Sequence, residues 1–299
     1  MRILITGGNG FIGAWIARRL AAEGHELRLF DIVERRDIVT AIAGAKIADA
    51  AEWVTGEIVD GLAVKAAAAG CDGIIHMAGI LTPACAADPV RGAQVNVIGT
   101  LNMFEAARAH GIKHIVYTSS AGVFGPDQGT EPFPITHYGT FKLANEGAAR
   151  AYFADHGVAS VGFRPYVVFG PGRESGLTAG PTLAARAAAR GEAYTIPYRG
   201  SAGLVYVDDV AAAYVAALLR EPDGAHVFNM VGEIASCEQV VAAIKRHVND
   251  ARIAIDGPEL PFTPDVPEGN VREVLTGLPA TPLADGMADT IAFYRKQPR

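Results

Sequence analysis

The chain has 299 residues, of which half are hydrophobic and 19% are charged, and its formal net charge is −6. This composition is typical of a globular protein with a large core, whereas a disordered chain has the opposite balance. The acidic charge provides no general attraction for nucleic acid or anionic membrane surfaces, so we expect neither as a partner and look for a small-molecule substrate.

The first 165 residues alternate short apolar runs with longer stretches of helical periodicity. Strands are predicted at residues 2–6, 26–31, 52–55, 73–77, 112–118 and 158–163, and the clearest helices at 12–23, 90–110 and 138–154. Almost wholly apolar strands that alternate with helices indicate an α/β fold with a doubly wound parallel sheet, the Rossmann arrangement. The ligand crevice of such a sheet lies beyond the carboxyl ends of its strands.

Glycine and proline become frequent after residue 164 and separate shorter segments. We therefore divide the chain into a Rossmann domain, residues 1–164, and a smaller C-terminal substrate-binding portion, residues 165–299. Residues 204–232 are expected to return to the Rossmann sheet, with the strand itself near 225–231. A helix is predicted at 238–248, and four prolines favour a loop at 256–267.

The three cysteines, Cys71, Cys85 and Cys237, have no CxxC spacing and no accompanying cluster of metal ligands. We therefore expect neither a disulfide framework nor a metal site. The first strand begins at residue 2, which leaves no room for a signal peptide, and no apolar stretch is long enough to cross a bilayer. The expected location is the cytoplasm.

The segment 6–13, TGGNGFIG, follows the first predicted strand and opens a helix. Gly7 fits a tight turn, Gly10 lets the backbone approach a pyrophosphate, and Gly13 lets the helix pack on the strand. Asp31 ends the next strand, where a carboxylate accepts hydrogen bonds from an adenosine ribose and repels a 2′-phosphate. The pattern predicts an NAD site with contacts at Gly7, Gly10, Phe11, Ile12, Gly13 and Asp31. Two neighbouring arginines, Arg35 and Arg36, leave NADP open.

Tyr138 and Lys142 are four residues apart and so lie on one face of the predicted helix. The sequence YTSS at 117–120 ends a buried strand upstream, at the crevice. Oxidation of an alcohol needs a base, and a free phenol with a pKa of ~10 is too weak an acid to act at neutral pH. A nearby ammonium and a nicotinamide ring lower that pKa. We expect Tyr138 as acid/base, Lys142 as its electrostatic partner and ribose anchor, and Ser120 as the residue that holds the reacting oxygen.

Eight stretches carry a resemblance that extends from residue 1 to about 220: residues 6–13, 56–60, 76–79, 88–100, 119–125, 138–142, 164–172 and 206–211, with a weaker match at 283–294. They resemble the extended short-chain dehydrogenase/reductase family, in its NAD-dependent epimerase/dehydratase branch. The resemblance implies that Ser120 rather than Ser119 is the catalytic hydroxyl. It also implies cofactor contacts at Glu57, Ile58, Met77, Ala78, Gly79, Tyr138, Lys142, Tyr166 and Val167. Related proteins pair the helices 90–110 and 138–154 in a dimer, so a homodimer is expected.

The sequence departs from family members that act on nucleotide sugars at two positions. They commonly have an asparagine where this chain has Val167, and an arginine in the stretch that reads GSAGL here, around Ala202. Both changes remove partners for a diphosphate, whose burial needs them. The candidate substrate contacts are Thr82, Ser120, Arg173 and Arg199, although both arginines also fit solvated loops. These losses favour a free sugar or sugar acid over a nucleotide sugar.

We therefore predict an NAD-dependent epimerase or dehydrogenase that acts on a secondary alcohol of a carbohydrate-like substrate: a sugar, sugar acid or nucleotide sugar. Two alternatives stay open, a reductase of a small non-sugar carbonyl compound and a non-catalytic protein that senses a dinucleotide. A dehydratase is disfavoured because Ser120 is followed by Ala121 and Gly122, which supply no carboxylate to remove an α-proton.

Four further polar residues are given structural interpretations. His76 is expected to be a buried, hydrogen-bonded histidine rather than a metal ligand. Asn96 is expected to brace the backbone or hold a water molecule. Asp208 and Asp209 are predicted to cap the helix at 210–219.

Overall fold

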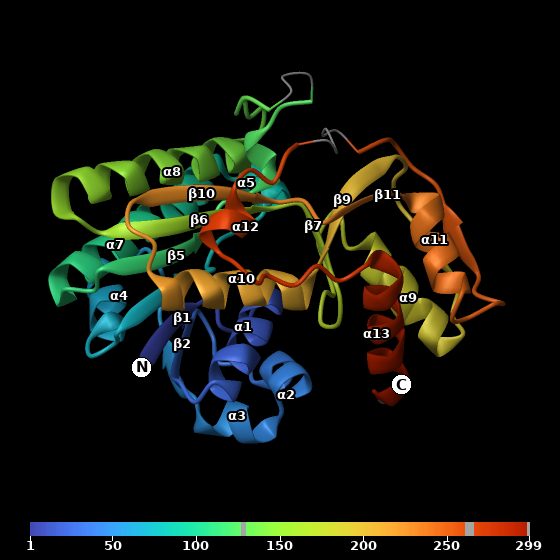
Figure 1. Ribbon diagram of the computed structural model, residues 1–299, viewed down its shortest axis with the longest axis horizontal. Helices are drawn as coiled ribbons and strands as arrows, with labels where there is room; N and C mark the ends of the chain where they lie inside the picture. The colour runs from blue at the N-terminus through green and yellow to red at the C-terminus, as the bar shows by residue number, and fades with distance from the viewer. Residues whose placement is uncertain (127–129, 261–265, 298–299) are drawn as a thin grey trace.

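The computed structural model describes residues 1–126, 130–260 and 266–297. A parallel seven-stranded sheet in the order β10-β6-β5-β4-β1-β2-β3 forms its centre (Figure 1). The strands are β1 (Arg2–Thr6), β2 (Glu26–Asp31), β3 (Glu52–Thr55), β4 (Gly73–His76), β5 (His114–Thr118), β6 (Ala159–Pro165) and β10 (Ala225–Met230). The strand order reverses between β1 and β4, which opens the ligand crevice of a Rossmann fold there, as predicted.

Helices cover both faces of this sheet and enclose two separate cores. One face is covered by α1 (Phe11–Ala22) and α10 (Val207–Arg220), with α2 (Asp37–Ala43) and α3 (Ala45–Ala50) packed against α1. The other face is covered by α4 (Gly61–Ala68), α7 (Gly99–His110) and α8 (His137–His156). Both faces are therefore closed to solvent, which explains why the strands are almost wholly apolar.

The helix predicted at 90–110 is one rod with a change of winding inside it. It starts as α6 (Pro89–Ala93), widens into a π-helical turn (Gln94–Ile98) and continues as α7. The short helix α5 (Thr82–Ala87) precedes it. π-helical turns inside α-helices are rare and often lie at functional sites. This turn contains Asn96, whose contacts are described below.

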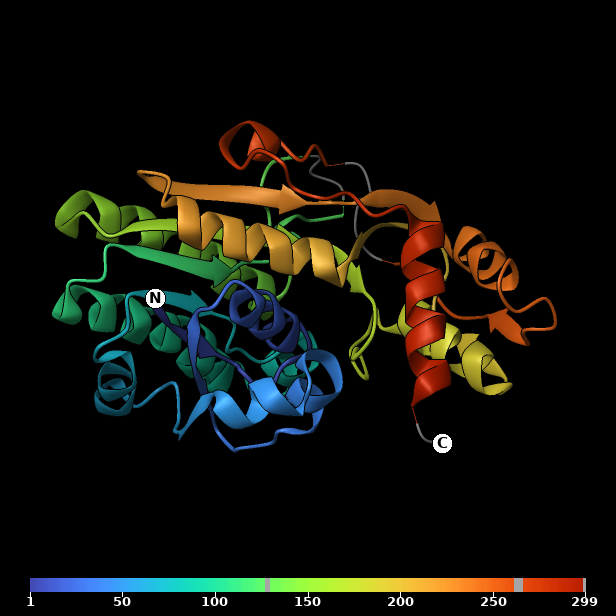
Figure 2. The same cartoon turned by 60° about the horizontal axis from the view of Figure 1, so that its bottom comes forward.

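A smaller lobe lies beyond the carboxyl ends of the strands of the large sheet. In Figure 2 the strands of the large sheet point toward this lobe. It contains a three-stranded sheet of β7 (Val167–Phe169), β9 (Ser201–Tyr206) and β11 (Glu233–Ser236), and a pair of β8 (Tyr194–Ile196) with β12 (Ile253–Ile255). Its helices are α9 (Gly180–Arg190), α11 (Cys237–Lys245) and α13 (Leu283–Lys296), whereas α12 (Val271–Val274) lies beside β10 of the large sheet (Figure 1). After β9 the chain returns to the large sheet, first with α10 on one face and then with β10 as its edge strand. The domain division at residue 164 stays a prediction, and the loop predicted at 256–267 lies partly outside the described residues.

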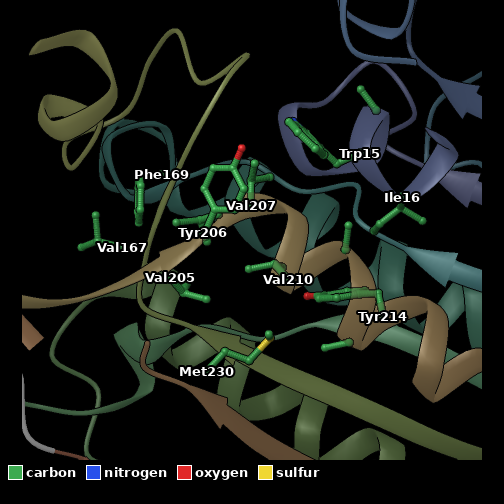
Figure 3. Packing of buried hydrophobic residues seen from close by; sticks show 14 of the residues in the cluster. Trp15, Ile16, Val167, Phe169, Val205, Tyr206, Val207, Val210, Tyr214 and Met230 are labelled. Carbon is green, nitrogen blue, oxygen red and sulfur yellow. The ribbon is translucent and has the colours of Figure 1, made fainter. Parts of the chain in front are cut away.

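The two lobes are joined through α1 and α10 (Figure 3). The Trp15 ring meets the Tyr206 ring edge-on at 6.0 Å, and the Trp15 indole N–H donates to the carbonyl of Pro171 at 2.9 Å. Arg19 of α1 pairs with Asp208 of α10 at 2.7 Å. These contacts hold the start of α10 against the helix that follows the nucleotide fingerprint.

The predicted capping role of Asp208 and Asp209 is wrong. Helix α10 begins at Val207, so both carboxylates lie in its first turn and its N-cap is Tyr206. Asp209 instead accepts hydrogen bonds from the Thr281 backbone N–H and hydroxyl at 2.6 and 2.8 Å. It therefore fastens the segment before α13 to the start of α10.

No helix among residues 1–126, 130–260 and 266–297 is long and apolar enough to cross a membrane.

We expect the protein to lose stability in acid because two of its histidines are buried. His76 and His114 are 4% and 3% exposed. Burial lowers the pKa of His76 to about 3 and that of His114 to about 4, so both stay neutral in the folded chain. The unfolded chain takes up these protons near pH 6.5. The free energy of unfolding is therefore at its full value above about pH 6.5. It decreases as the pH falls towards 4, by up to about 3 kcal/mol for each histidine.

Urea unfolding between pH 7.5 and 4.5 measures this loss. His114→Leu removes a ring whose two nitrogens have no hydrogen-bond partner in the described structure. We expect this variant to be as stable as the wild type at pH 7.5 and to lose less stability on acidification. An unchanged dependence of the unfolding free energy on pH would show that His114 is not responsible.

Candidate active site

The nucleotide fingerprint forms the turn between β1 and α1. Gly7 has a φ of +70°, and a Cβ there would lie 2.9 Å from the Ala78 backbone nitrogen, so only glycine fits. The Gly10 N–H donates to the Gly7 carbonyl at 2.9 Å. Helix α1, whose first turn holds Phe11, Ile12 and the buried Gly13, has no side-chain cap. Its uncapped N–H groups and the glycine turn suit a pyrophosphate.

Asp31 lies at the end of β2 beside this turn. Its carboxylate accepts hydrogen bonds from the backbone N–H groups of Asn9 at 3.0 Å and Ile32 at 2.8 Å. These bonds fix the carboxylate next to the fingerprint, as an interaction with the adenosine ribose requires.

Ser120, Tyr138 and Lys142 come together where β5 ends and α8 begins. Thr136 caps α8, its hydroxyl accepting from the Gly139 N–H at 3.1 Å, which sets Tyr138 in the first turn. The Ser120 hydroxyl accepts from the Gly122 N–H at 3.0 Å. A Cβ at Gly122 would lie 3.3 Å from the Ser120 Oγ and 3.7 Å from the Tyr138 Cδ1, so the two side chains meet at this turn. The serine proton and a second lone pair stay available for a bond to a reacting oxygen.

The Lys142 ammonium is buried on the same side of α8. It donates to the carbonyl of Thr118 at 2.8 Å and lies 5.5 Å from the centre of the Tyr138 ring. No carboxylate in the described parts of the chain forms an ion pair with this ammonium. The predicted trio is thus brought together by the end of one strand and one turn of helix.

Burial disfavours the charged forms of both Tyr138 and Lys142, the phenolate and the ammonium. It raises the pKa of Tyr138 to about 12, although the hydrogen bond from Ser120 acts in the opposite direction. Burial also lowers the pKa of Lys142 to about 8. The phenol is therefore protonated at neutral pH, and it needs positive charge beyond that of Lys142 before it can act as a base. A cationic nicotinamide ring bound nearby has the required sign.

The two adjacent serines have different environments. Ser119 is 1% exposed, and its hydroxyl donates to the Glu146 carboxylate at 2.5 Å. Of the two serines, Ser120 is the one that acts on the pKa of Tyr138. This geometry agrees with the choice of Ser120 over Ser119 that the family resemblance implied.

His76 and Asn96 have the structural contacts expected of them. The two ring nitrogens of His76 lie 2.7 Å from the Thr6 hydroxyl and 3.1 Å from the Thr100 hydroxyl. The Asn96 amide N–H₂ donates to the carbonyls of Ile80 at 3.0 Å and Gly92 at 3.1 Å. Asn96 thus braces the loop after β4 against the helix that follows. No group of three or more metal-ligating side chains gathers anywhere in the described residues.

The other predicted cofactor residues lie around the ends of the strands. Met77, Ala78 and Gly79 follow β4, where the Met77 sulfur accepts from the Thr118 hydroxyl at 3.0 Å. Glu57 pairs with Arg91 at 2.6 Å, so one of its oxygens is already engaged. Ile58 and Tyr166 are buried, and Val167 is 2% exposed, packed in the core and paired with Leu204 of β9 (Figure 3). Their cofactor roles stay predictions.

The predicted substrate residues divide into two groups. Arg173 is turned inward, donating to the Val168 carbonyl and to the Thr178 hydroxyl, and it lies near Leu81, the residue before Thr82. Arg199 instead forms an exposed pair with Asp256 at 3.1 Å, next to β12. Arg173 therefore lies near the start of α5, which holds Thr82, whereas Arg199 is a solvated loop arginine, as the alternative interpretation expected.

A separate hollow of about 380 Å³ lies between β9, β10 and the segment before α13. Its carboxylates Asp209 and Glu233 accept from the backbone N–H groups of Thr281 and Leu283. None of the fingerprint or Ser-Tyr-Lys residues lines it. We interpret it as the gap over which the C-terminal segment is anchored, and not as the reaction site.

Two contributors to the site were not predicted from the sequence. Thr118 offers its backbone carbonyl to Lys142 and receives a hydrogen bond from the Tyr214 hydroxyl at 3.0 Å. Glu146 lies four residues after Lys142 on α8, and this spacing alone was a usable signal, because it places a carboxylate on the face that carries Tyr138. The residues that Glu146 contacts, Ser119 and Arg164, are distant from it in sequence.

The glycine turn, with a fixed carboxylate beside it, faces the same crevice as the Ser-Tyr-Lys cluster, an arrangement that suits a dinucleotide-dependent enzyme. The family model described as "NAD dependent epimerase/dehydratase family" matches residues 3–230. The chain belongs to this family, and it is an NAD-dependent enzyme of the extended short-chain dehydrogenase/reductase type.

Known proteins of two activities are similar to this chain. A UDP-glucose 4-epimerase of Mycolicibacterium smegmatis is 32% identical, with 99% of each chain covered. A uronate dehydrogenase of Agrobacterium fabrum is 36% identical over 52% of this chain and 57% of its own. The crystal structure of a Thermus thermophilus UDP-glucose 4-epimerase in complex with NAD has a TM-score of 0.81 at 24% identity, covering 99% of both chains. This last likeness concerns the fold.

Proposed function

We propose that this enzyme transfers hydride between NAD and a secondary alcohol of a carbohydrate-like substrate, using Ser120, Tyr138 and Lys142. The observation that carries the proposal is the meeting of Ser120 and Tyr138 beside a buried Lys142 that has no carboxylate partner in the described residues. Such a cluster can hold an alcohol oxygen and accept its proton in one geometry. A sensor of dinucleotide has no need of it.

The reaction in this proposal begins with proton removal at Tyr138. The phenolate oxygen takes the proton of the substrate hydroxyl while Ser120 holds the same oxygen by a hydrogen bond. Bound NAD supplies the acceptor for the hydride. Lys142 stabilises the phenolate from below the ring and anchors the cofactor ribose. As the carbonyl forms, Ser120 continues to donate to its oxygen, which is worth more in a dry site than in water.

The residues that would hold the cofactor are distributed along the carboxyl edge of the sheet. We assign the pyrophosphate to Gly7, Gly10, Phe11, Ile12 and Gly13, and the adenosine ribose to Asp31. The adenine side is assigned to Glu57 and Ile58, and the nicotinamide side to Met77, Ala78, Gly79, Tyr166 and Val167. The fit rests on the close approach at Gly7 and on the uncapped start of α1.

The choice of NAD over NADP is expected to depend on Asp31. A 2′-phosphate there meets a fixed carboxylate, while Arg36 is already paired with Glu34 at 2.6 Å and with Asp49 at 3.3 Å. We expect NADH to bind at least about 10-fold more tightly than NADPH, and Asp31→Asn to narrow the difference. Fluorescence titration of both nucleotides measures it, with Asp37→Asn on α2 as the control. Equal binding by the wild type would refute the role of Asp31.

The substrate is proposed to be small and to carry an anionic group. Val167 is buried in the core and offers no polar partner for a nucleotide diphosphate. Arg173, by contrast, is a cation without a carboxylate partner in the described residues, and burial lowers its pKa to about 10. A substrate carboxylate would provide the missing counter-charge. These features favour a sugar acid over a nucleotide sugar, and the uronate dehydrogenase relative acts on a compound of that class by its name.

A screen for NAD reduction tests the proposal. Free sugars, sugar acids and nucleotide sugars are each mixed with the enzyme and NAD, and both NADH and epimerised products are measured. Net NADH formation supports a dehydrogenase, and interconversion without net NADH supports an epimerase. A reductase of small non-sugar carbonyl compounds is the second candidate, because Ser120 and Tyr138 would contact only the reacting oxygen, which both substrate classes share. No reaction with any compound would favour the dinucleotide sensor.

The homodimer and the cytoplasmic location stay predictions. Val90 is 70% exposed and Ile98 is 44% exposed, and both lie on the rod formed by α6, the π-helical turn and α7. Burial of such side chains between two copies would favour association. Light scattering in solution determines the number of chains per particle.

A further inference from the structure

We propose that Glu146 is a positioning residue for the reaction. Together with Arg164 it holds both ends of the segment 119–124, and so fixes the Ser120 hydroxyl against Tyr138. The inference rests on the proposed function, because Glu146 acts through Ser120 and does not touch the reacting atoms.

Glu146 and Arg164 form a buried, two-pronged ion pair behind the Ser-Tyr-Lys cluster. One carboxylate oxygen of Glu146 accepts from the Arg164 Nε at 2.8 Å, and the other accepts from Nη2 at 2.6 Å. Only 1% of the Glu146 side chain is exposed. A buried pair of this kind gives little net stability over an apolar pair of the same volume. The contribution of this ion pair is therefore to fix the positions of the groups that it contacts.

The carboxylate holds the first end of the segment through Ser119. The Ser119 hydroxyl donates to Glu146 at 2.5 Å, and its backbone N–H donates to the Phe163 carbonyl at 2.7 Å. Ser120 has an extended backbone, with φ −164° and ψ 149°. Neighbouring side chains of extended backbone point to opposite sides. With Ser119 fixed inward, Ser120 is directed outward to the phenol.

The guanidinium holds the second end of the segment. The Arg164 guanidinium carbon lies 5.0 Å from the centre of the Phe124 ring, in a cation–π contact. Phe124 follows the 3₁₀ turn Ala121–Val123, whose Gly122 N–H donates to the Ser120 hydroxyl. A shift of Phe124 therefore moves the donor that orients Ser120. One ion pair thus sets both the backbone direction and the hydrogen-bond partner of this serine.

The test is the pKa of Tyr138 in the NAD complex, followed by the near-ultraviolet absorbance of its phenolate. The Tyr138→Phe variant identifies which ionisation belongs to this residue. Ser119→Ala removes only one hydrogen bond, so we expect it to fold and to raise the Tyr138 pKa by about one unit. Glu146→Gln is expected to act in the same direction, and the double variant to show less than the sum of the two shifts. Ser119→Thr, which keeps the hydroxyl, should restore the wild-type value.

Glu105→Gln is the matched control, because it breaks an exposed ion pair with Arg108 on α7, away from the cluster. It should leave the Tyr138 pKa unchanged. If Ser119→Ala has no effect whereas Ser120→Ala raises the pKa, the positioning role is wrong and the proposed function survives. If Ser120→Ala also leaves the pKa and turnover unchanged, the proposed function itself fails.

Discussion

Tyr138→Phe is expected to lower turnover by about 10²- to 10⁴-fold, the usual contribution of a positioned acid/base group. The ring and its packing are retained, so the loss reflects the hydroxyl alone. NAD binding should change little, because the fingerprint and Asp31 contacts are untouched. The measurement is kcat, with the NAD dissociation constant determined alongside.

Tyr152→Phe is the control for this variant. Tyr152 lies on the same helix, and its hydroxyl donates to Glu105 at 2.9 Å, far along α8 from Ser120. It should keep nearly full activity. Full turnover by Tyr138→Phe, in an assay where the wild type is active, would mean that another group moves the proton.

Gly139→Ala is expected to have the second largest effect. A Cβ at this position would lie 2.0 Å from the Gly122 carbonyl oxygen, which no side-chain rotation can relieve. The 3₁₀ turn must then move away from α8 and take Ser120 away from Tyr138. Misplacement by about 1 Å can cost about 10²-fold in rate, and overpacking costs about 1–3 kcal/mol of stability. We expect a fall of that size in kcat together with a lower melting temperature.

Gly147→Ala provides a matched change on the same helix. The nearest atom to a Cβ there is the Arg150 Nη2 at 3.9 Å, so the methyl group fits without displacement. Alanine favours helix over glycine by up to about 1 kcal/mol, so this variant should be as stable as the wild type or slightly more so. If both alanine variants behave alike, the close contact of Gly139 with Gly122 does not govern the site.

The sequence was sufficient for the parts of the fold that depend on local pattern. The strands of the large sheet lie within two residues of their predicted bounds, because a doubly covered sheet demands apolar runs that are visible in any window. The helix at 90–110 was predicted without its π-helical turn, since the burial pattern continues through residues 94–98. The small lobe was predicted only in outline. Its strands are as short as β7 and β8 and are defined by partners distant in sequence.

The same distinction applies to the site. Tyr138 and Lys142 share one helix face, and Ser120 ends a strand, so spacing and topology together predicted their meeting. The role of Glu146 depends on Arg164 of β6 and on Ser119, which directly follows β5, and no local pattern reports these contacts. The prediction that Asp208 and Asp209 cap this helix fails because α10 begins three residues before the predicted start at 210. Arg199 was a substrate candidate on sequence position alone, and its pairing with Asp256 depends on β12.

A single-turnover experiment tests the central claim most directly. Enzyme with a stoichiometric amount of NAD is mixed with the best substrate from the screen, and the absorbance of reduced nicotinamide is followed in the wild type and in Tyr138→Phe. We predict that NADH forms in the wild type, persisting for a dehydrogenase and decaying for an epimerase, and is absent on the same timescale in the variant. NADH formation at equal rates in both proteins would contradict the assignment of Tyr138.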